Sequence, residues 1–350
     1  MKICVYTIAK NEEKFVKRWA ESCSEADYRI ICDTGSTDKT VEIAKNCGVT
    51  VHSKKFKVWR FDKARNWSLS CIPEDVDMCI ALDMDEVLLP GWRAALENIE
   101  SDVTRPRYKY VWSWDQDGSE GLVYSADKIH TRNGYKWSHP VHEVLTPTKN
   151  EKQAWVNNLI IHHYPDHEKS RSQYLPLLEL AVKEKPKDDR NQFYLAREYF
   201  FNNKNELAIK HFKLHLELST WTAERAASCR YLSKIDLARR EHWIFRAIAE
   251  DSSRRESWVE LAQYYYDFEN WTACQFASSM ALKIKKKPLD YLCDSDSWGW
   301  KPHDLMAISS YWLEDYENAY KHGAMAYKLR KYDERLEKNL KFYKSKINLN

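Results

Sequence analysis

The first hundred residues alternate short apolar runs with stretches in which apolar positions recur at helical spacing. This pattern is typical of buried strands joined by crossover helices in a largely parallel sheet. It predicts the order β-α-β-α-β, then a further helix and a fourth apolar strand that ends in acidic residues. The predicted strands are 3–8, 28–32, 49–51 and 78–82, and the predicted helices are 12–24, 38–46 and 62–70.

Residues 107–165 are richer in aromatic residues and contain the turn pairs Asp117-Gly118 and Asn133-Gly134. Such a segment predicts antiparallel strands and loops that complete the same domain. We expect the sheet to end near His163, so the first domain is assigned to residues 1–165.

Beyond Pro165 the strand-like runs stop, and apolar residues recur at helical spacing almost to the end. We therefore expect an all-α domain over residues 166–350. A loose repeat runs through it, in which small residues would let paired helices approach closely, as in tetratricopeptide-type hairpins. A generic helical bundle is the alternative. The repeat groups are Ala196/Tyr199/Ala208, Ala262/Tyr265/Ala273 and Ala307/Tyr311/Ala319.

Composition narrows the class of protein. Hydrophobic residues make up 43% and charged residues 31% of the 350 positions, which excludes a mainly disordered chain. The sequence has no leader and no long apolar run, so we expect no membrane span and a cytoplasmic location. Nine cysteines without a Cys-x-x-Cys pair predict buried thiols, and neither a disulfide framework nor a zinc site.

The strongest candidate for chemistry is Asp83-Met84-Asp85-Glu86, directly after the apolar strand 78–82. Ligands bind at the carboxyl ends of parallel strands, and hard carboxylate oxygens suit Mg²⁺ or Mn²⁺ carrying a diphosphate. Taken alone, an acid pair of this kind also fits a solvated loop or a helix cap.

Three blocks precede this one, in the order Tyr6 to Glu13, Asp33 to Thr40 and Phe61 to Asn66. The four blocks and their spacing resemble the family 2 glycosyltransferases, in particular the subgroup whose catalytic domain is followed by tetratricopeptide-like helices. The resemblance covers residues 1–165 with specific motifs and the helical half only loosely. It implies a GT-A fold, which is a Rossmann-like domain with a mixed sheet, and a nucleoside-diphosphate sugar as donor.

The resemblance also implies roles for donor-binding residues. The end of the first strand, with Thr7, Asn11 and Glu12, would form one wall of the nucleotide pocket. Asp33 would accept the N3–H of a uracil-like base. The alternative role for Asp33 is to cap the turn before Gly35. Arg65 would face the donor diphosphate, whose geometry suits a guanidinium group. The alternative interpretation is that Arg65 is an ordinary surface arginine.

For the metal, Mn²⁺ or Mg²⁺, the resemblance implies Asp85 as the direct ligand. Asp83 would contact the ribose, or the metal through a water molecule. His163 could add an imidazole ligand, and a hydrogen-bonded structural histidine is the competing interpretation. The metal would stabilise the departing nucleoside diphosphate as a Lewis acid.

The catalytic base is expected in the segment Trp137 to Glu143, which resembles a His-Glu element late in the catalytic domain. Glu143 is the first choice and His142 the second. The base would remove the acceptor proton while the anomeric carbon acquires oxocarbenium character. A single displacement inverts the anomeric configuration.

Uridine diphosphate is favoured as the carrier, with UDP-glucose as one such donor, although thymidine offers the same N3–H group. Protein, saccharide and a hydroxymethylated DNA base stay open as acceptors. The lysine runs 283–287 and 321–346 would suit nucleic acid, but interleaved acids favour solvated helix faces. On a DNA acceptor, Trp112, Trp114 and Trp137 could stack with an extruded base. The helical domain would bind the acceptor or form a homodimer.

Two other functions compete with glycosyl transfer. A helical-repeat interaction scaffold with an inactive glycosyltransferase-like head would have lost Asp85, Arg65 or the His-Glu element, and all of them are present. A sugar nucleotidyltransferase would need a glycine-rich triphosphate loop after the first strand. Residues 9–12 contain no glycine, which disfavours that reaction.

Overall fold

The computed structural model describes residues 1–166 and 173–347, and it divides into two compact units, Met1–Ala181 and Val182–Asn350. The division falls inside helix α5 (Tyr174–Glu184), later in the chain than the expected boundary after residue 165. The start of α5 belongs with the first unit because the Tyr174 ring contacts the rings of Phe61 and His142.

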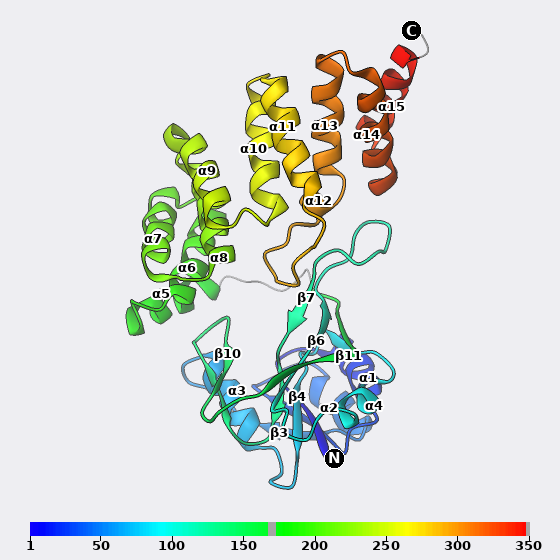
Figure 1. Cartoon of the computed structure of the whole chain (residues 1–350). Helices are drawn as coiled ribbons and strands as arrows, with labels where there is room; N and C mark the ends of the chain where they lie inside the picture. Colours follow the sequence, from blue (N-terminus) through cyan, green and yellow to red (C-terminus); the bar gives the residue numbers. More distant parts are fainter. Residues whose placement is uncertain (167–172, 348–350) are drawn as a thin grey trace. The chain divides into compact units, whose positions relative to one another are not determined.

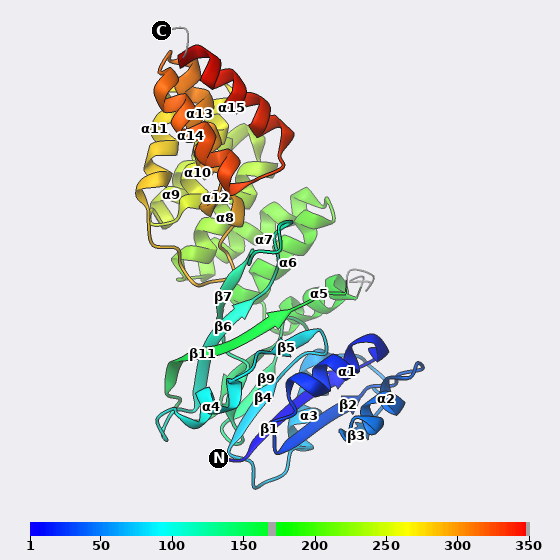
Figure 2. The same cartoon turned by 90° about the vertical axis from the view of Figure 1, so that its right-hand side faces the viewer.

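The first unit is built on a five-stranded sheet with the order β3-β2-β1-β4-β8 (Figures 1 and 2). The first four of these strands in the sequence run parallel, as predicted, and β8 is antiparallel to β4. The strands are β1 (Ile3–Ala9), β2 (Tyr28–Asp33), β3 (Thr50–Ser53), β4 (Met78–Ala81) and β8 (Ile129–Thr131). The connecting helices are α1 (Glu13–Ser22), α2 (Thr40–Asn46) and α3 (Phe61–Ser70).

The central strand β1 is buried on both faces, which explains why its sequence is a continuous apolar run. Ile3 and Val5 pack into one core cluster with Trp19 of α1. Cys4 and Tyr6 point to the opposite face and pack into a second cluster. Side chains alternate along a strand, so one short segment supplies both cores.

A second sheet has the order β5-β11-β6-β7, and β9 pairs with β10 in a separate hairpin. The expectation of antiparallel strands holds for β5/β11, β6/β7 and β9/β10 but is wrong for β6/β11, which pair in parallel. The chain returns to the end of the sheet where β6 begins, and Gln153 therefore pairs with Arg105. The last strand ends at His163, as expected. The strands are β5 (Glu86–Leu88), β6 (Arg105–Val111), β7 (Val123–Ala126), β9 (Tyr135–Ser138), β10 (Val144–Pro147) and β11 (Gln153–His163), with helix α4 (Trp92–Glu97) after β5.

The second unit is helical throughout its described residues, as the sequence predicts (Figure 1). Its α-helices are α6 (Asp189–Phe201), α7 (Asn205–Leu218), α8 (Thr222–Ile235), α9 (Arg240–Glu250), α10 (Arg255–Asp267), α11 (Trp271–Lys283), α12 (Ser295–Trp298), α13 (Lys301–Trp312), α14 (Tyr316–Leu329) and α15 (Glu334–Ile347). Several begin at an Asp or Asn whose side chain accepts a backbone N–H of the first turn, which is a favourable N-cap.

The alanines of the loose repeat lie where the helices approach one another. Five of the six are fully buried: Ala196, Ala208, Ala262, Ala307 and Ala319. Ala273 is only partly buried, and the neighbouring Cys274 occupies the buried position on α11 instead. Ala273 was expected at the close approach of two helices. This expectation is wrong, because the next residue, Cys274, lies there.

Among the helices that the structure describes, none has the length and apolar content needed to cross a membrane.

Candidate active site

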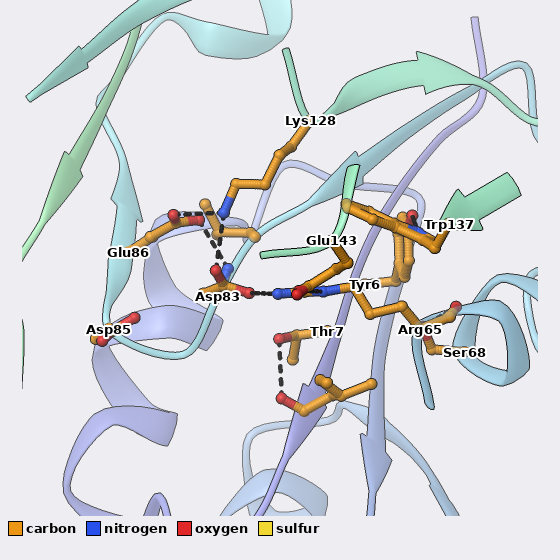
Figure 3. Close-up of polar contacts among 12 residues, drawn as sticks. Tyr6, Thr7, Arg65, Ser68, Asp83, Asp85, Glu86, Lys128, Trp137 and Glu143 are labelled. Carbon is orange, nitrogen blue, oxygen red and sulfur yellow. Dashed lines mark hydrogen bonds and ion pairs between the residues drawn. The ribbon is translucent and has the colours of Figure 1, made fainter. Parts of the chain in front are cut away.

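The candidate site lies at the carboxyl ends of β1 and β4, where the strand order of the first sheet changes direction. Thr7 of β1 is fully buried there, and its hydroxyl donates to the carbonyl of Ile8 at 3.2 Å. Asp83 follows β4 directly. Figure 3 shows Thr7 beside the contact between Asp83 and Arg65.

Arg65 of α3 is buried between two carboxylates, with 6% of its surface exposed. Its Nη2 donates to Asp83 Oδ1 at 2.7 Å, and its Nε donates to Glu143. The guanidinium lies over the ring of Trp137, 4.9 Å from the ring centre. Burial acts to lower the pKa of Arg65, but the charges of Asp83 and Glu143 outweigh it and raise this pKa. The third nitrogen, Nη1, is buried without a hydrogen-bond partner.

Lys128, in the segment between β7 and β8, belongs to the candidate site although no sequence pattern indicated it. Its Nζ donates to Asp83 Oδ2 at 2.8 Å and to Glu86 Oε1 at 2.6 Å (Figure 3). Glu86 Oε1 also accepts the Tyr110 hydroxyl at 2.6 Å, and Glu86 Oε2 accepts the backbone N–H of Asp83 at 2.8 Å. No motif surrounds Lys128, and only the fold brings it to the acidic loop.

Asp83 is thus held by two cations. Burial acts to raise its pKa, but Arg65 and Lys128 more than offset burial and hold the pKa of this carboxyl well below its usual range. Glu86 differs, because burial raises its pKa despite the ion pair with Lys128. Each oxygen of Asp83 already accepts a bond from one of the cations, so a ligand that contacts Asp83 must share or replace these bonds.

Asp85 and His163 come together from separate elements, as the resemblance implied. His163 Nε2 lies 3.4 Å from Asp85 Oδ2. His163 Nδ1 lies 2.9 Å from the carbonyl oxygen of Trp112, and its ring stacks on the Trp112 ring at 4.3 Å. A carbonyl only accepts, so Nδ1 donates, and in the neutral imidazole Nε2 presents a lone pair toward Asp85. Burial acts to lower the pKa of His163, but the hydrogen bond and charge of Asp85 outweigh it and raise this pKa.

A divalent metal at this point would have few protein ligands. Within the residues that the structure describes, no group of three or more His, Cys, Asp or Glu side chains is placed to hold a metal ion. Asp85 and His163 offer one oxygen and one oriented imidazole nitrogen, a donor set that Mn²⁺ accepts. The pair fits a metal whose other ligands are water and the diphosphate of a substrate.

The predicted wall of the nucleotide pocket is a pair of linked loops. Asn11 has a left-handed backbone with φ of 56°, its N–H donates to Ser36 Oγ at 2.9 Å, and its Oδ1 accepts the Thr37 N–H at 2.8 Å. The Glu12 N–H donates to Thr40 Oγ1 at 2.7 Å. These bonds tie the loop after β1 to the loop after β2.

Asp33 at the end of β2 makes the turn contacts that were the alternative to base binding. Its carboxylate accepts the backbone N–H groups of Gly35 at 3.1 Å and Ser36 at 3.0 Å. The carboxylate of Asp38 accepts the Thr40 N–H at 3.0 Å and the Thr40 hydroxyl at 2.6 Å at the start of α2.

The two candidate bases lie between β9 and β10. Glu143 accepts the Nε–H of Arg65 on its Oε1. His142 has a left-handed backbone with φ of 48° and meets the Tyr174 ring edge-on at 5.5 Å. Trp137 is buried beneath Arg65 with 3% exposure, so the expectation that it could stack with an extruded base is wrong.

Below Trp137 a buried hydrogen-bond chain supports the site. Trp137 Nε1 donates to the hydroxyl of Tyr6 at 3.1 Å, and this hydroxyl lies 2.9 Å from His130 Nε2. His130 Nδ1 lies 2.7 Å from the carbonyl oxygen of Thr131, so Nδ1 donates and Nε2 accepts from Tyr6. Burial, with Arg105 adding to it, lowers the pKa of His130 to about 4.

The comparison with protein families agrees with this geometry. Residues 4–105 match the model of the glycosyl transferase family 2. The N-terminal unit therefore carries a glycosyltransferase domain of that family, which confirms the resemblance seen in the sequence. No curated protein matches the chain.

Several solved structures resemble parts of this chain at low sequence identity and low TM-score. The Cut9–Hcn1 hetero-tetramer of the APC/C shares 11% identity over 49% of this chain and 33% of its own, with a TM-score of 0.40. Glucosyl-3-phosphoglycerate synthase from Mycobacterium tuberculosis, in complex with Mn²⁺, UDP and glucosyl-3-phosphoglycerate, shares 24% identity over 31% of this chain and 44% of its own, with a TM-score of 0.26. A TPR repeat-containing protein from Cytophaga hutchinsonii shares 14% identity over 51% of this chain and 66% of its own, with a TM-score of 0.40. This chain thus spans less than half the length of the first two.

Replacement of Lys128 by Met should destabilise the protein, because Asp83 and Glu86 would lose their shared cation. Breaking a buried ion pair in this way costs about 3 kcal/mol or more in the free energy of unfolding. The matched control is Lys109→Met, which removes a more exposed ion pair with Glu120 and should cost under about 1 kcal/mol. Urea denaturation of the two variants measures both values, and equal losses would contradict the role given to Lys128.

The buried His130 should make the protein less stable in mild acid. Its folded pKa of about 4 lies below the unfolded value near 6.5, so the unfolded chain takes up the proton first as the pH falls below 6.5. Between pH 6.5 and 4.5 this costs about 2 kcal/mol in the free energy of unfolding, and almost nothing is lost above about pH 7.5. His130→Gln should show a smaller acid loss than the wild-type protein in urea denaturation at the two pH values. Identical pH slopes would show that His130 does not set the acid sensitivity.

Proposed function

We propose that this protein transfers a sugar from a nucleoside-diphosphate donor, with UDP-sugars favoured, to a nucleophile on an acceptor. The observation that carries the proposal is the cluster at the ends of β1 and β4. There Arg65 and Lys128 flank Asp83, and Asp85 of the same loop pairs with His163 at the end of β11. The cluster lies within or beside the segment that matches the family 2 glycosyltransferases.

Asp85 and His163 are the residues that would hold Mn²⁺ or Mg²⁺. When bound, the metal would supply Lewis-acid stabilisation of the charge that develops on the departing diphosphate. The Trp112 carbonyl holds the imidazole in the orientation that aims Nε2 at Asp85. The stacked Trp112 ring restricts rotation of this imidazole.

The donor diphosphate is assigned to the positive side of the cluster. Arg65 keeps its charge in a buried position, and its Nη1 still has a hydrogen to donate. Phosphate oxygens, like carboxylate oxygens, make strong and often two-point hydrogen bonds with guanidinium groups. Lys128 adds a second cation, so the diphosphate could replace part of the bonding that Asp83 now provides.

The base of the nucleotide would donate its N3–H to Asp33. The Asp33 carboxylate already accepts two backbone N–H groups, but its two oxygens offer about four acceptor positions. The turn contacts fix the carboxylate and leave capacity for one N3–H. The loops that Asn11 and Glu12 tie together would form the adjoining wall.

Glu143 is favoured over His142 as the base that takes the proton of the acceptor. Its Oε1 is fixed by the hydrogen bond from Arg65. A carboxylate held in this way can accept a proton on Oε2 without leaving Arg65. Attack on the face opposite the diphosphate then inverts the anomeric configuration.

The acceptors to be tested are protein, saccharide and hydroxymethylated DNA.

Asp85→Asn should abolish metal-dependent use of the donor, because the amide is a weaker ligand and carries no charge. In a thermal-shift assay, UDP and UDP-glucose with Mn²⁺ should raise the unfolding midpoint of the wild-type protein and not that of the variant. Hydrolysis of the donor should fall by a factor of about 100 or more. Asp117→Asn, in an exposed turn, is the control and should behave as wild type. Full Asp85→Asn activity in metal-free buffer would refute the assignment.

Glu143→Gln should lower the rate of sugar transfer by a factor of about 100 or more, since general-base catalysis typically contributes that much. The amide can still accept from Arg65, so the Mn²⁺-dependent UDP shift should stay. His142→Gln should change the rate by less than about tenfold. The reverse pattern, in which His142→Gln is the inactive variant, would assign the base to His142.

A further inference from the structure

The helical unit contains a cavity of about 270 Å³ that the proposed reaction does not use. It lies among α6, α8, α10 and the segment that leads into α12. Arg197 comes from α6, Arg230 and Tyr231 from α8, and Glu256 from α10. Tyr291 comes from the segment before α12.

Arg197 is an unpaired cation in the wall of this cavity. Its guanidinium lies 5.6 Å from the ring centre of Phe193 and 5.4 Å from that of Tyr194. Its Nε is buried and has no hydrogen-bond partner. No carboxylate pairs with Arg197 among residues 1–166 and 173–347. Burial acts to lower the pKa of Arg197, but the neighbouring tyrosines, Tyr231 foremost, outweigh it and raise this pKa, so the side chain stays charged.

Arg230, on α8, also has no ion pair within the described residues. The acidic side chains in the wall, by contrast, are engaged. Glu260 lies 3.9 Å from Lys234, and Asp294 accepts the Ser297 N–H at 3.1 Å as a helix cap.

Glu256 is engaged through Oε1, whereas its buried Oε2 has no hydrogen-bond partner. It accepts the Asp294 N–H at 3.0 Å and Trp298 Nε1 at 2.9 Å, and it lies 3.7 Å from Arg254. The wall of the cavity therefore has two arginines, Arg197 and Arg230, that form no ion pair within the described residues.

A ligand of Arg197 and Arg230 would be an anion, and the side chains around them limit which class of anion can bind. A planar guanidinium matches a carboxylate in a two-point contact. The volume admits one or two side chains. The carboxylates of Glu256, Glu260 and Asp294 in the same wall would repel the continuous phosphates of a nucleic acid, whereas they can accept N–H groups of a peptide.

We propose that this cavity binds a glutamate or aspartate side chain of an acidic peptide, with Arg197 and Arg230 as the carboxylate-binding residues. The site lies entirely within the helical unit, and the proposal does not depend on the glycosyltransferase assignment. It gives the helical unit a recognition role for an acidic segment of a partner polypeptide.

The test is fluorescence anisotropy of the full-length protein with a labelled peptide that carries three consecutive glutamates between glycine and serine residues. We expect binding that weakens with salt and is lost when the glutamates are replaced by glutamines. Arg197→Gln and Arg230→Gln should each weaken binding by about tenfold or more. Lys210→Gln, which removes one positive charge from the exposed side of α7, should change it less than about twofold.

A folding defect is separated from a binding defect by the thermal midpoint. Arg197→Lys keeps the charge without the planar fork, so it should keep the wild-type midpoint and bind with intermediate affinity. The proposal is overturned if the acidic peptide does not bind, if the glutamine peptide binds equally, or if Arg197→Gln binds as well as wild type. Binding of inorganic phosphate or a DNA oligonucleotide without binding of the peptide would also overturn it.

Discussion

The candidate active site depends on one carboxylate, that of Asp83, held between Arg65 and Lys128. These two cations arrive from different parts of the chain, one on a helix and one in a segment between strands. Removal of either cation would leave negative charge clustered at the end of β4, where Asp83, Asp85 and Glu86 follow one another. The bonds to Asp83 therefore fix the relative positions of the acidic loop, helix α3 and the segment before β8.

The same bonds set the electrostatic state of the site before any ligand arrives. Arg65 and Lys128 stay charged because carboxylates surround them, and Asp83 stays ionised because they surround it. A donor diphosphate would enter a site whose cations are already oriented, so less reorganisation would be needed during the reaction. The hydrogen-bond chain from Trp137 through Tyr6 to His130 supports this arrangement from below.

Much of the fold could be predicted from the sequence because its signals are local. Continuous apolar runs predict the buried strands β1, β2 and β4. Apolar residues at helical spacing predict the helices after residue 173. The parallel pairing of β6 with β11 could not be predicted, since it depends on the path of the chain between them. The partial burial of Ala273 is a matter of helix register, which the loose repeat did not define.

For the site, the motif blocks indicated Arg65, Asp83, Asp85, Glu143 and His163, and the fold brings them into two adjoining groups. Lys128 was missed because a single lysine outside any motif carries no sequence signal. The ion pair of Arg65 with Glu143 was also unforeseen, as it requires the β9–β10 hairpin to lie against α3. The lack of an ion pair at Arg197 and Arg230 could not be predicted, because it depends on which side chains the packing of the helices brings near them.

The parallel pairing of β6 with β11 also affects how the protein folds. His163 occupies the final position of β11, and this strand inserts between β5 and β6. Until it does so, β5 and β6 have unpaired edges, and contacts between segments far apart in sequence form slowly. During synthesis the acidic loop therefore exists well before its imidazole partner, and the pair of Asp85 and His163 forms only when the last strand closes the sheet.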